Sequence, residues 1–274
     1  MGPQNPNLIH LTNIVAYATK TLSMDKSRTT NNKTSYEVES KVENFHWWFI
    51  VRRKILKSIL SSINLPINTL TLDIGCGTGS NLGILTSSGF YTIGLDRSIY
   101  ALTLVKNRMG EGDFHLLAGD LHNLPIKTKS VGLIIAMDIF EHLEDDLRGI
   151  CESYRALVDG GVLVLTVPAF KFLWGTQDDV TGHKTRYLSK DIKKKLGEAG
   201  FNILKCSYFN FFLFIPILFA RRIVRFFKLK ISSENELNFP LMNFLLRSVF
   251  SIEVHTMKYF SFPFGVSIFC IVRK

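Results

Sequence analysis

Between residues 69 and 168 the sequence alternates short apolar runs with amphipathic stretches, and this alternation restricts its fold more than any other feature. The run at 131–137 is continuously apolar, as expected for a central strand that is covered on both faces. Strand and helix patterns that alternate at this spacing predict an α/β fold with a doubly wound, mostly parallel sheet. The predicted strands are 69–74, 91–95, 114–118, 131–137 and 162–167, and the predicted helices between them are 80–88, 99–108 and 144–157.

The segments on either side of this alternation are less regular. Residues 1–40 are polar and weakly periodic, so they are predicted to be a loose extension, whereas residues 42–63 have the apolar spacing of an amphipathic helix. Residues 41–274 are predicted to form one domain, with a helical insertion at 211–262. After a polar loop that follows residue 169, the predicted elements are a helix at 189–199, strands at 201–210 and 266–273, and helices at 211–230 and 237–251.

The first predicted strand runs directly into the glycine loop GCGTG at residues 75–79. Glycine allows a sharp turn there and lets a ligand approach the backbone. Asp96 ends the next predicted strand, 21 residues after Gly75, where a carboxylate can accept both hydroxyls of a ribose. Ser80 breaks the dinucleotide fingerprint, and no lysine follows the loop as a phosphate-binding loop requires. With Asp73 just before the loop, the pattern favours a nucleoside that carries an amino-acid tail.

Four segments taken together resemble the class I S-adenosylmethionine-dependent methyltransferases, in a type 11-like and poorly characterised subgroup. They are LDIGCGTG at 72–79, the acid of GLDRS at Asp96, GDLHNLP at 119–125 and AMDIFEHLED at 136–145. The resemblance covers roughly residues 45–210 and is specific as a set. It implies a Rossmann-like, seven-stranded sheet whose last strand is antiparallel. It also implies the cofactor S-adenosylmethionine, with S-adenosylhomocysteine as the product.

The resemblance further implies roles for individual residues of the cofactor site. Asp73 would lie near the methionine amino group and Asp96 would bind the ribose. Asp120 would accept a hydrogen bond from the adenine amine, and Leu121 would donate its backbone N–H to the ring. Arg97 would flank the adenine. The complete implied set is Asp73, Gly75, Cys76, Gly77, Gly79, Asp96, Arg97, Asp120, Leu121 and Met137.

Two further segments are similar to the same subgroup. One is HWWF at 46–49 followed by two arginines, and the other contains GHKTRY at 182–187. The usual pattern of the second segment is GH-x-RRY, so Lys184 and Thr185 depart from it and Arg186 is the better-matched basic residue. Trp47 and Trp48 are interpreted as lid or core residues, with a cation–π contact to the sulfonium as the alternative.

Methyl transfer from a sulfonium is an in-line displacement, so the protein mainly positions the acceptor, excludes water and, for a hydroxyl acceptor, removes a proton. His142 and His183 are the candidate general bases, and Asp138 is a candidate for orienting the acceptor. A purely structural role stays open for all three. The four cysteines form no C-x-x-C pair, so no metal site is predicted.

Positive charge and phenylalanine are concentrated in the second half of the chain. The net charge is +10, and residues 171–230 contain 13 Lys and Arg against 4 Asp and Glu. The apolar run at 209–220 continues into Arg221, Arg222 and Arg225 and is too short to span a bilayer. A helix of this kind suits the interface of an anionic membrane. A buried helix or a homodimer contact is the alternative.

The acceptor is the least determined part of the prediction. DIFE at 138–141 replaces the tetrad typical of adenine methylation, which argues against methylation of a base. We favour O-methylation of a small or lipid-linked acceptor, such as a saccharide or a prenylated precursor. An RNA methyltransferase that uses the 171–230 basic patch and a non-catalytic cofactor-binding protein are the alternatives. The cysteines are interpreted as reduced thiols, so a cytoplasmic location is expected, peripheral at the inner membrane face if the interfacial interpretation holds.

Overall fold

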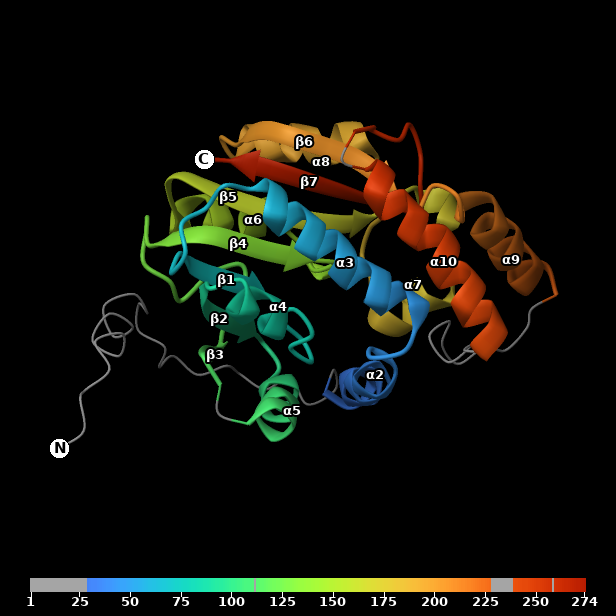
Figure 1. The fold of residues 1–274 in the computed structure, drawn as a ribbon, viewed down its shortest axis with the longest axis horizontal. Helices are drawn as coiled ribbons and strands as arrows, with labels where there is room; N and C mark the ends of the chain where they lie inside the picture. Colours follow the sequence, from blue (N-terminus) through green and yellow to red (C-terminus); the bar gives the residue numbers. More distant parts are fainter. Residues whose placement is uncertain (1–28, 111, 228–238, 258) are drawn as a thin grey trace.

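The computed structural model describes residues 29–110, 112–227, 239–257 and 259–274, which are built around one seven-stranded sheet (Figure 1). The strand order is β3-β2-β1-β4-β5-β7-β6. Strand β7 runs antiparallel to both of its neighbours, and the other pairs are parallel. The predicted fold class is therefore confirmed. The strands are β1 (Leu70–Ile74), β2 (Tyr91–Asp96), β3 (Phe114–Ala118), β4 (Val131–Met137), β5 (Leu157–Pro168), β6 (Asn202–Phe209) and β7 (Ser267–Arg273).

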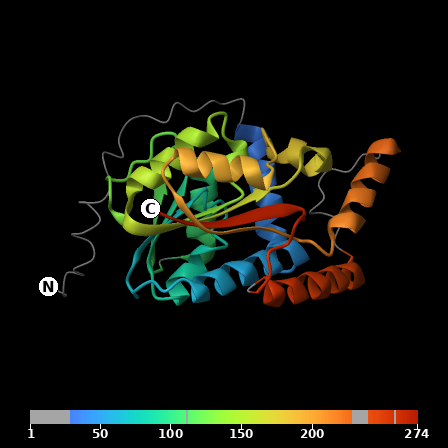
Figure 2. The ribbon, with the colours of Figure 1, turned by 90° about the horizontal axis from the view of Figure 1, so that it is seen from above.

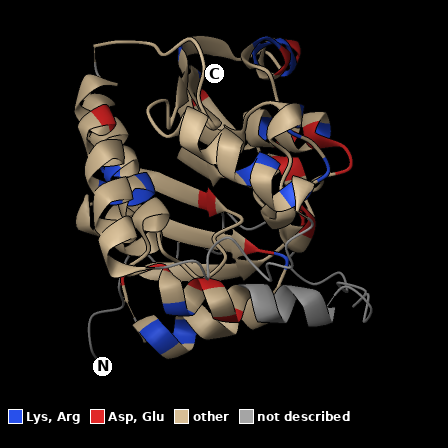
Figure 3. Ribbon diagram, turned by 90° about the vertical axis from the view of Figure 1, so that its right-hand side faces the viewer, with Lys and Arg blue, Asp and Glu red and all other residues tan. Residues whose placement is uncertain are grey.

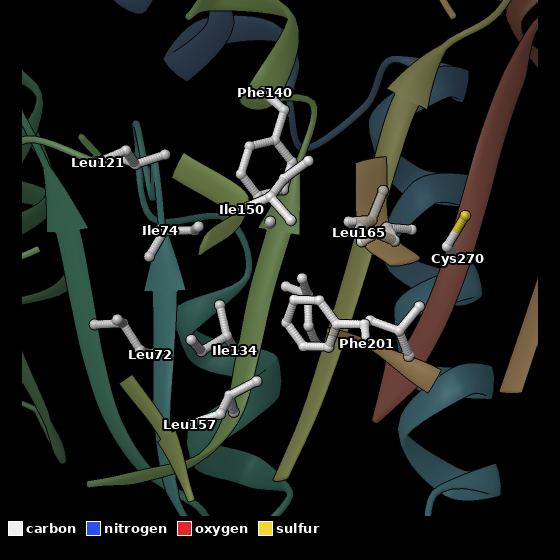
Figure 4. Close-up of a cluster of buried hydrophobic side chains, with 14 of the residues drawn as sticks. Leu72, Ile74, Leu121, Ile134, Phe140, Ile150, Leu157, Leu165, Phe201 and Cys270 are labelled. Carbon is white, nitrogen blue, oxygen red and sulfur yellow. The ribbon is translucent and has the colours of Figure 1, made fainter. Parts of the chain in front are cut away.

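Helices cover both faces of the sheet (Figures 1 and 2). Successive residues of β4 are buried against opposite layers, Ile134 in the cluster with α6 and α8 and Leu133 in the cluster with α3, α4 and α10. Figure 4 shows the first of these two clusters. Burial on both sides explains why β4 is apolar throughout. The helices are α3 (Trp47–Ser62), α4 (Leu82–Ser87), α5 (Ile99–Met109), α6 (Asp146–Ala156), α8 (Ser189–Glu198) and α10 (Pro240–Thr256).

The N-terminal part differs from its prediction. Residues 1–28 lie outside the described residues, but the expected loose extension was wrong for residues 29–40, which belong to helix α2 (Thr29–Val42). The expected helix at 42–63 is also interrupted, because α3 begins only at Trp47, with His46 as its N-cap. Tertiary contacts stabilise α2. The carboxylate of Glu43 is buried, pairs with Arg108 and accepts a hydrogen bond from Thr78 Oγ1 at 2.5 Å.

The chain between β5 and β7 forms the rim of the molecule at one end of the sheet. The predicted polar loop contains the short helix α7 (Thr176–Thr181), and the two helical patterns correspond to α9 (Phe214–Phe226) and α10. Two single 3₁₀ turns, η1 (Phe140–His142) and η2 (Lys171–Leu173), follow β4 and β5. Within the described ranges, none of the helices has the length and apolar character needed to traverse a bilayer. All four cysteines are free thiols.

Candidate active site and cofactor pocket

A cavity of about 600 Å³ opens at the carboxyl ends of the parallel strands. This is the edge at which open α/β sheets bind ligands, next to the point where the strand order reverses between β1 and β4. The volume lies within the ~300–1,000 Å³ that is common for small-molecule sites. Side chains from α2, α3, η1, α7 and α9 complete its walls, so the helical cap contributes as much of the lining as the sheet does.

The glycine loop after β1 has left-handed backbone at Gly75, Gly77 and Gly79, with φ between +52° and +80°. A Cβ on Gly75 would lie 2.5 Å from the Ile139 side chain, and one on Gly79 would lie 2.9 Å from Val105. These two glycines therefore allow close packing. Gly77 faces the cavity, where Tyr36 of α2 is the nearest side chain at 3.8 Å.

Asp96 lies at the end of β2, lines the cavity and is almost fully buried. Its Oδ2 accepts a hydrogen bond from Gly77 N at 2.9 Å, and its Oδ1 accepts one from Ser98 N at 2.8 Å. Burial raises the pKa of Asp96 above its usual value, and the two backbone donors partly offset this rise. The Tyr36 side chain also bonds to this carboxylate, and the lone pair that remains can accept a ribose hydroxyl. Its position fits the predicted ribose contact.

Asp120 follows β3 and lines the cavity together with Arg97 and Leu121. Its Oδ1 accepts hydrogen bonds from the backbone N–H of His122 at 2.8 Å and from its ring nitrogen at 2.9 Å. Burial tends to raise the pKa of Asp120, but the two bonds from His122 outweigh it and leave the pKa below its usual value. An ionised acceptor is therefore held where the adenine amine is expected.

Two residues of the predicted cofactor set do not line the cavity among the described residues, namely Asp73 and Gly79. Asp73 is buried in β1, where Oδ1 accepts a hydrogen bond from Asn81 Nδ2 at 3.4 Å and Oδ2 has no hydrogen-bond partner. Burial raises the pKa of Asp73 to about 7. Asn81 does line the cavity, so it connects Asp73 to the site. The direct contact expected of Gly79 is replaced by packing against α5.

The end of β4 is joined to helix α3 by an ion pair. Asp138, in a left-handed conformation with φ +55°, lies 3.1 Å from Arg52 Nη1 and accepts a hydrogen bond from Thr166 Oγ1 at 2.9 Å. Arg52 Nη2 also donates to the carbonyl of Met137 at 3.3 Å. These contacts favour the structural interpretation of Asp138, which secures the cap to the strand ends. Met137 and Asp138 both line the cavity.

The two candidate bases lie together and both line the cavity. The rings of His142 and His183 meet edge to face, with centroids 4.7 Å apart. Burial lowers the pKa of His142 to about 3, and His183 beside it acts in the same direction. His142 is therefore a neutral imidazole at pH 7. The cavity brings together both bases that the sequence predicted.

His183 is oriented by a buried carboxylate. Its Nδ1 lies 2.7 Å from Asp178 Oδ1, and Arg186 donates to both oxygens of Asp178, from Nε at 2.8 Å and from Nη2 at 3.0 Å. Burial tends to raise the pKa of Asp178, but the bonds from His183 and Arg186 hold it below its usual range. Arg186 thus positions His183 through Asp178, and it also lines the cavity itself.

Tryptophan residues of α3 pack into the cap. Trp48 stacks on Phe209 and Phe250, with centroids 6.0 and 5.7 Å away, and Trp47 meets Phe250 edge to face. Both tryptophans also line the cavity. Their contacts favour the predicted role as lid and core residues.

Sequence reasoning missed several lining residues. Tyr36 and Glu39 come from α2, which the polar composition of the segment did not predict, and Asn210 follows β6. Glu141 was also missed, although it precedes the candidate base His142 in the chain. Its position in the motif AMDIFEHLED was the one signal available for it.

Comparison with known proteins bears directly on this site. Residues 72–165 match the methyltransferase domain family, and that range includes the glycine loop, Asp96, Asp120 and His142. This segment of the chain is therefore similar to the S-adenosylmethionine-dependent methyltransferases. A "Probable S-adenosylmethionine-dependent methyltransferase" of Mycolicibacterium smegmatis is 28% identical over 134 residues, which cover 48% of this chain and 51% of that protein.

The proteins that this chain resembles differ in their acceptors. A malonyl-[acyl-carrier protein] O-methyltransferase of Marinomonas sp. is 26% identical, over 51% of this chain and 55% of that protein. The phosphoethanolamine N-methyltransferase 2 of Haemonchus contortus, solved with S-adenosyl-L-methionine, has a TM-score of 0.55 at 18% identity, covering 81% of this chain and 52% of that chain. The first likeness is one of sequence and the second is one of fold. The chain spans about half the length of the curated relatives it matches.

The residues of the site fit the cofactor of this class, S-adenosylmethionine. Asp96 offers a lone pair for a ribose, Asp120 offers an ionised acceptor for the adenine amine, and Gly77 has no side chain to obstruct a ligand. Asp73, with an unpartnered oxygen beside Asn81, can balance an ammonium group across the cavity wall. When bound, the cofactor supplies a methyl group on a sulfonium sulfur.

Proposed function

We propose that the chain is an S-adenosylmethionine-dependent methyltransferase that methylates an oxygen of a small or lipid-linked acceptor, such as a saccharide or a prenylated precursor. One observation carries this proposal. A single cavity joins a cofactor end, lined by Gly77, Asp96 and Asp120, to an acceptor end, lined by Asp138, His142 and His183. Met137 and Asp138 lie between the two ends, after the central strand. An acceptor bound beside the histidines is therefore in reach of a sulfonium held near Met137.

The acceptor end carries groups suited to removing a proton from a hydroxyl. Burial lowers the pKa of His142, so its ring is neutral at pH 7 and has a lone pair to offer to a hydroxyl, but the same low pKa makes it a weak base. A positioned general base is worth ~10²–10⁴ in rate. The Trp47 and Trp48 side chains limit access of water from the α3 side, and the Arg52–Asp138 ion pair keeps α3 against the strand ends. These features favour transfer of the methyl group to an acceptor oxygen over its transfer to water.

The first test is transfer of labelled methyl groups. We expect purified protein with labelled cofactor to label one component of a fractionated host extract, with the lipid and aqueous phases assayed separately. Label in RNA would replace this proposal with the nucleic-acid alternative. Calorimetric binding of S-adenosylhomocysteine, with no label in any fraction, would favour a non-catalytic cofactor-binding protein. A matched preparation carrying Asp96→Ala serves as the control for contaminating enzymes.

A lipid-linked acceptor is supported by an apolar surface on the cap, which we call the α9–α10 surface. The basic residues of α9, coloured blue in Figure 3, are all arginines, while most of α10 carries no charge. Arginines 222, 225 and 247 accompany the apolar side chains. Large exposed apolar patches mark interaction sites, and cations beside them favour anionic lipid over another apolar protein face. The exposed apolar residues of this surface are Ile215, Phe219, Ile223, Phe226, Phe227, Phe239, Leu241, Met242, Phe244, Leu245, Val249 and Ile252.

We infer that the α9–α10 surface rests on an anionic membrane, which makes the chain a peripheral protein of the inner membrane face. In flotation experiments, the chain should rise with phosphatidylglycerol vesicles, should stay behind with phosphatidylcholine vesicles, and should be released by added salt. The double variant Phe226→Ser/Phe244→Ser should reduce binding at least tenfold, because burying each ring is worth about 1.5–3 kcal/mol.

The matched control is Ile67→Ser, which removes an equally exposed apolar side chain from the loop between α3 and β1. It should leave flotation unchanged. A dimer in solution that the double variant dissociates would assign the α9–α10 surface to a second copy and would overturn the membrane assignment.

A further inference from the structure

In the described part of the chain, Glu141 in the η1 turn after β4 and Asn210 after β6 are the two buried side chains with both polar atoms unpartnered, and Glu141 is the one that can carry a charge. Glu141 is fully buried, and neither Oε1 nor Oε2 has a hydrogen-bond partner among the described residues. A buried carboxylate without partners is costly and is rarely retained without a ligand or a functional role. Glu141 lines the acceptor end of the cavity, so a ligand can reach it.

Two imidazoles face the same point. One ligand atom from each of Glu141, His142 and His183 can be chosen so that all three lie within 4.8 Å of one another. His183 Nε2 lies 3.8 Å from Glu141 Oε1, too far for a hydrogen bond but suitable for two ligands of a shared ion. Metal–ligand bonds of ~2.0–2.2 Å place two ligand atoms at most ~4.4 Å apart. Small side-chain rotations would therefore bring the three ligand atoms, now within 4.8 Å of one another, to the distances that a shared ion requires.

The partner of His183 determines which ring nitrogen is available. Asp178 is buried and accepts two hydrogen bonds from Arg186, and its Oδ1 lies 2.7 Å from Nδ1, so its carboxylate accepts the proton of Nδ1. The lone pair of Nε2 then points toward Glu141. A carboxylate that orients a histidine in this way is typical of metal sites, where it fixes the tautomer and increases the basicity of the ligand.

We propose that Glu141, His142 and His183 bind a divalent transition-metal ion, with an open coordination position toward the acceptor end of the cavity. Two imidazoles and one carboxylate suit zinc, iron, manganese or cobalt better than magnesium or calcium, which prefer oxygen ligands alone. The ion supplies the positive charge that the buried Glu141 carboxylate lacks. The site is assembled from two segments 41 residues apart along the chain, so no contiguous metal-binding motif marks it in the sequence.

This proposal deepens the proposed function and rests on it for its chemical role. An acceptor hydroxyl bound at the open position is acidified by the ion and loses its proton to water. The resulting oxygen forms the bond to the methyl carbon while the carbon–sulfur bond breaks, and the sulfur keeps that electron pair as a neutral thioether. A metal-bound oxygen nucleophile replaces a free imidazole base, which gives the two histidines a role as ligands.

The test is metal binding by the full-length chain after treatment with a chelator. We expect calorimetry to find one equivalent of Zn²⁺ bound with micromolar affinity or tighter, Co²⁺ to give a ligand-field spectrum, and Zn²⁺ to raise the Tm. Glu141→Gln and His183→Gln should each lower the affinity for Zn²⁺ at least tenfold, while both variants should still bind S-adenosylhomocysteine. Glu144→Gln removes a neighbouring, exposed carboxylate and should bind Zn²⁺ like the unaltered chain.

Failure of the metal site and failure of the proposed function are separable. Absence of Zn²⁺, Co²⁺ and Mn²⁺ binding at 1 mM, in a protein that still binds S-adenosylhomocysteine, would overturn the metal site alone. The same holds if Zn²⁺ binds equally to the Glu141→Gln and His183→Gln variants. A loss of methyl transfer in Glu141→Gln without any metal binding would show that the cluster relays protons, which also overturns the proposal.

Discussion

The two ends of the cavity are built in different ways. At the cofactor end, Asp96 bonds to residues 19 and 2 positions away, and Asp120 bonds to His122 two positions away. At the acceptor end, Arg52 reaches Met137 across 85 positions, and the Trp47 N–H donates to Asn243 across 196 positions. Short-range contacts create a motif that can be recognised along the chain. Long-range contacts create a site with no contiguous signature, which is why the acceptor is harder to identify than the cofactor.

The largest effect is expected from Arg186→Ala at the acceptor end. Removing the guanidinium leaves the buried charge of Asp178 without its main partner, and breaking a buried pair in this way costs about 3–5 kcal/mol. The free energy of unfolding, measured with denaturant, should fall by that amount. Lys194→Gln, which removes one partner of an exposed pair on α8, should change it little. Equal effects of the two substitutions would contradict the role assigned to Arg186.

A smaller, pH-dependent effect is expected from Asp73 below the glycine loop. Its pKa is about 7 in the folded chain and ~3.9 when unfolded, so between these values the folded state holds the extra proton. Stability should therefore fall as pH rises from 4 to 7, by up to about 1.4 kcal/mol per pH unit.

The variant Asp73→Asn lacks this ionisable group, so its unfolding free energy should depend less steeply on pH over that interval. Above about pH 8 the difference between the two proteins should become constant. If the unfolding free energies of the two proteins changed in parallel from pH 4 to 8, the pKa of Asp73 would not be raised in the folded chain. Denaturant unfolding at each pH measures the unfolding free energy of the unaltered chain and of the variant.

The smallest change in free energy is expected at Asp96, and it tests the cofactor end of the cavity most directly. Asp96→Ala should weaken the binding of S-adenosylmethionine at least tenfold, because the ribose loses its hydrogen-bond acceptor. A tenfold loss of affinity corresponds to ~1.4 kcal/mol. Calorimetry measures this affinity, and the exposed Asp159→Ala variant should bind as the unaltered chain does. An unchanged affinity in Asp96→Ala would remove the basis for the cofactor end as described.

Several wrong or missing predictions share one physical cause. Helix α2 is polar and weakly amphipathic, so periodicity could not reveal it. It is held by the buried Glu43, which contacts Thr78 and Arg108 in other elements. The loop containing Asp178 was predicted as irregular because the bonds that order it come from Arg186 and His183. Local propensity was decisive in β1–β4, where strand and turn residues act within a few positions.

The sequence by itself determined the class of fold and the cofactor end, because strand periodicity, the glycine loop and the acids after β2 and β3 act over short stretches of chain. Only the tertiary structure decided which residues face the cavity and that Asp73 lies behind Asn81. It also decided that Glu141 is buried beside His142 and His183 with no hydrogen-bond partner in the described part of the chain. The reason is that burial, ionisation and side-chain pairing depend on which distant segments pack together. Neither composition nor spacing along the chain specifies that packing.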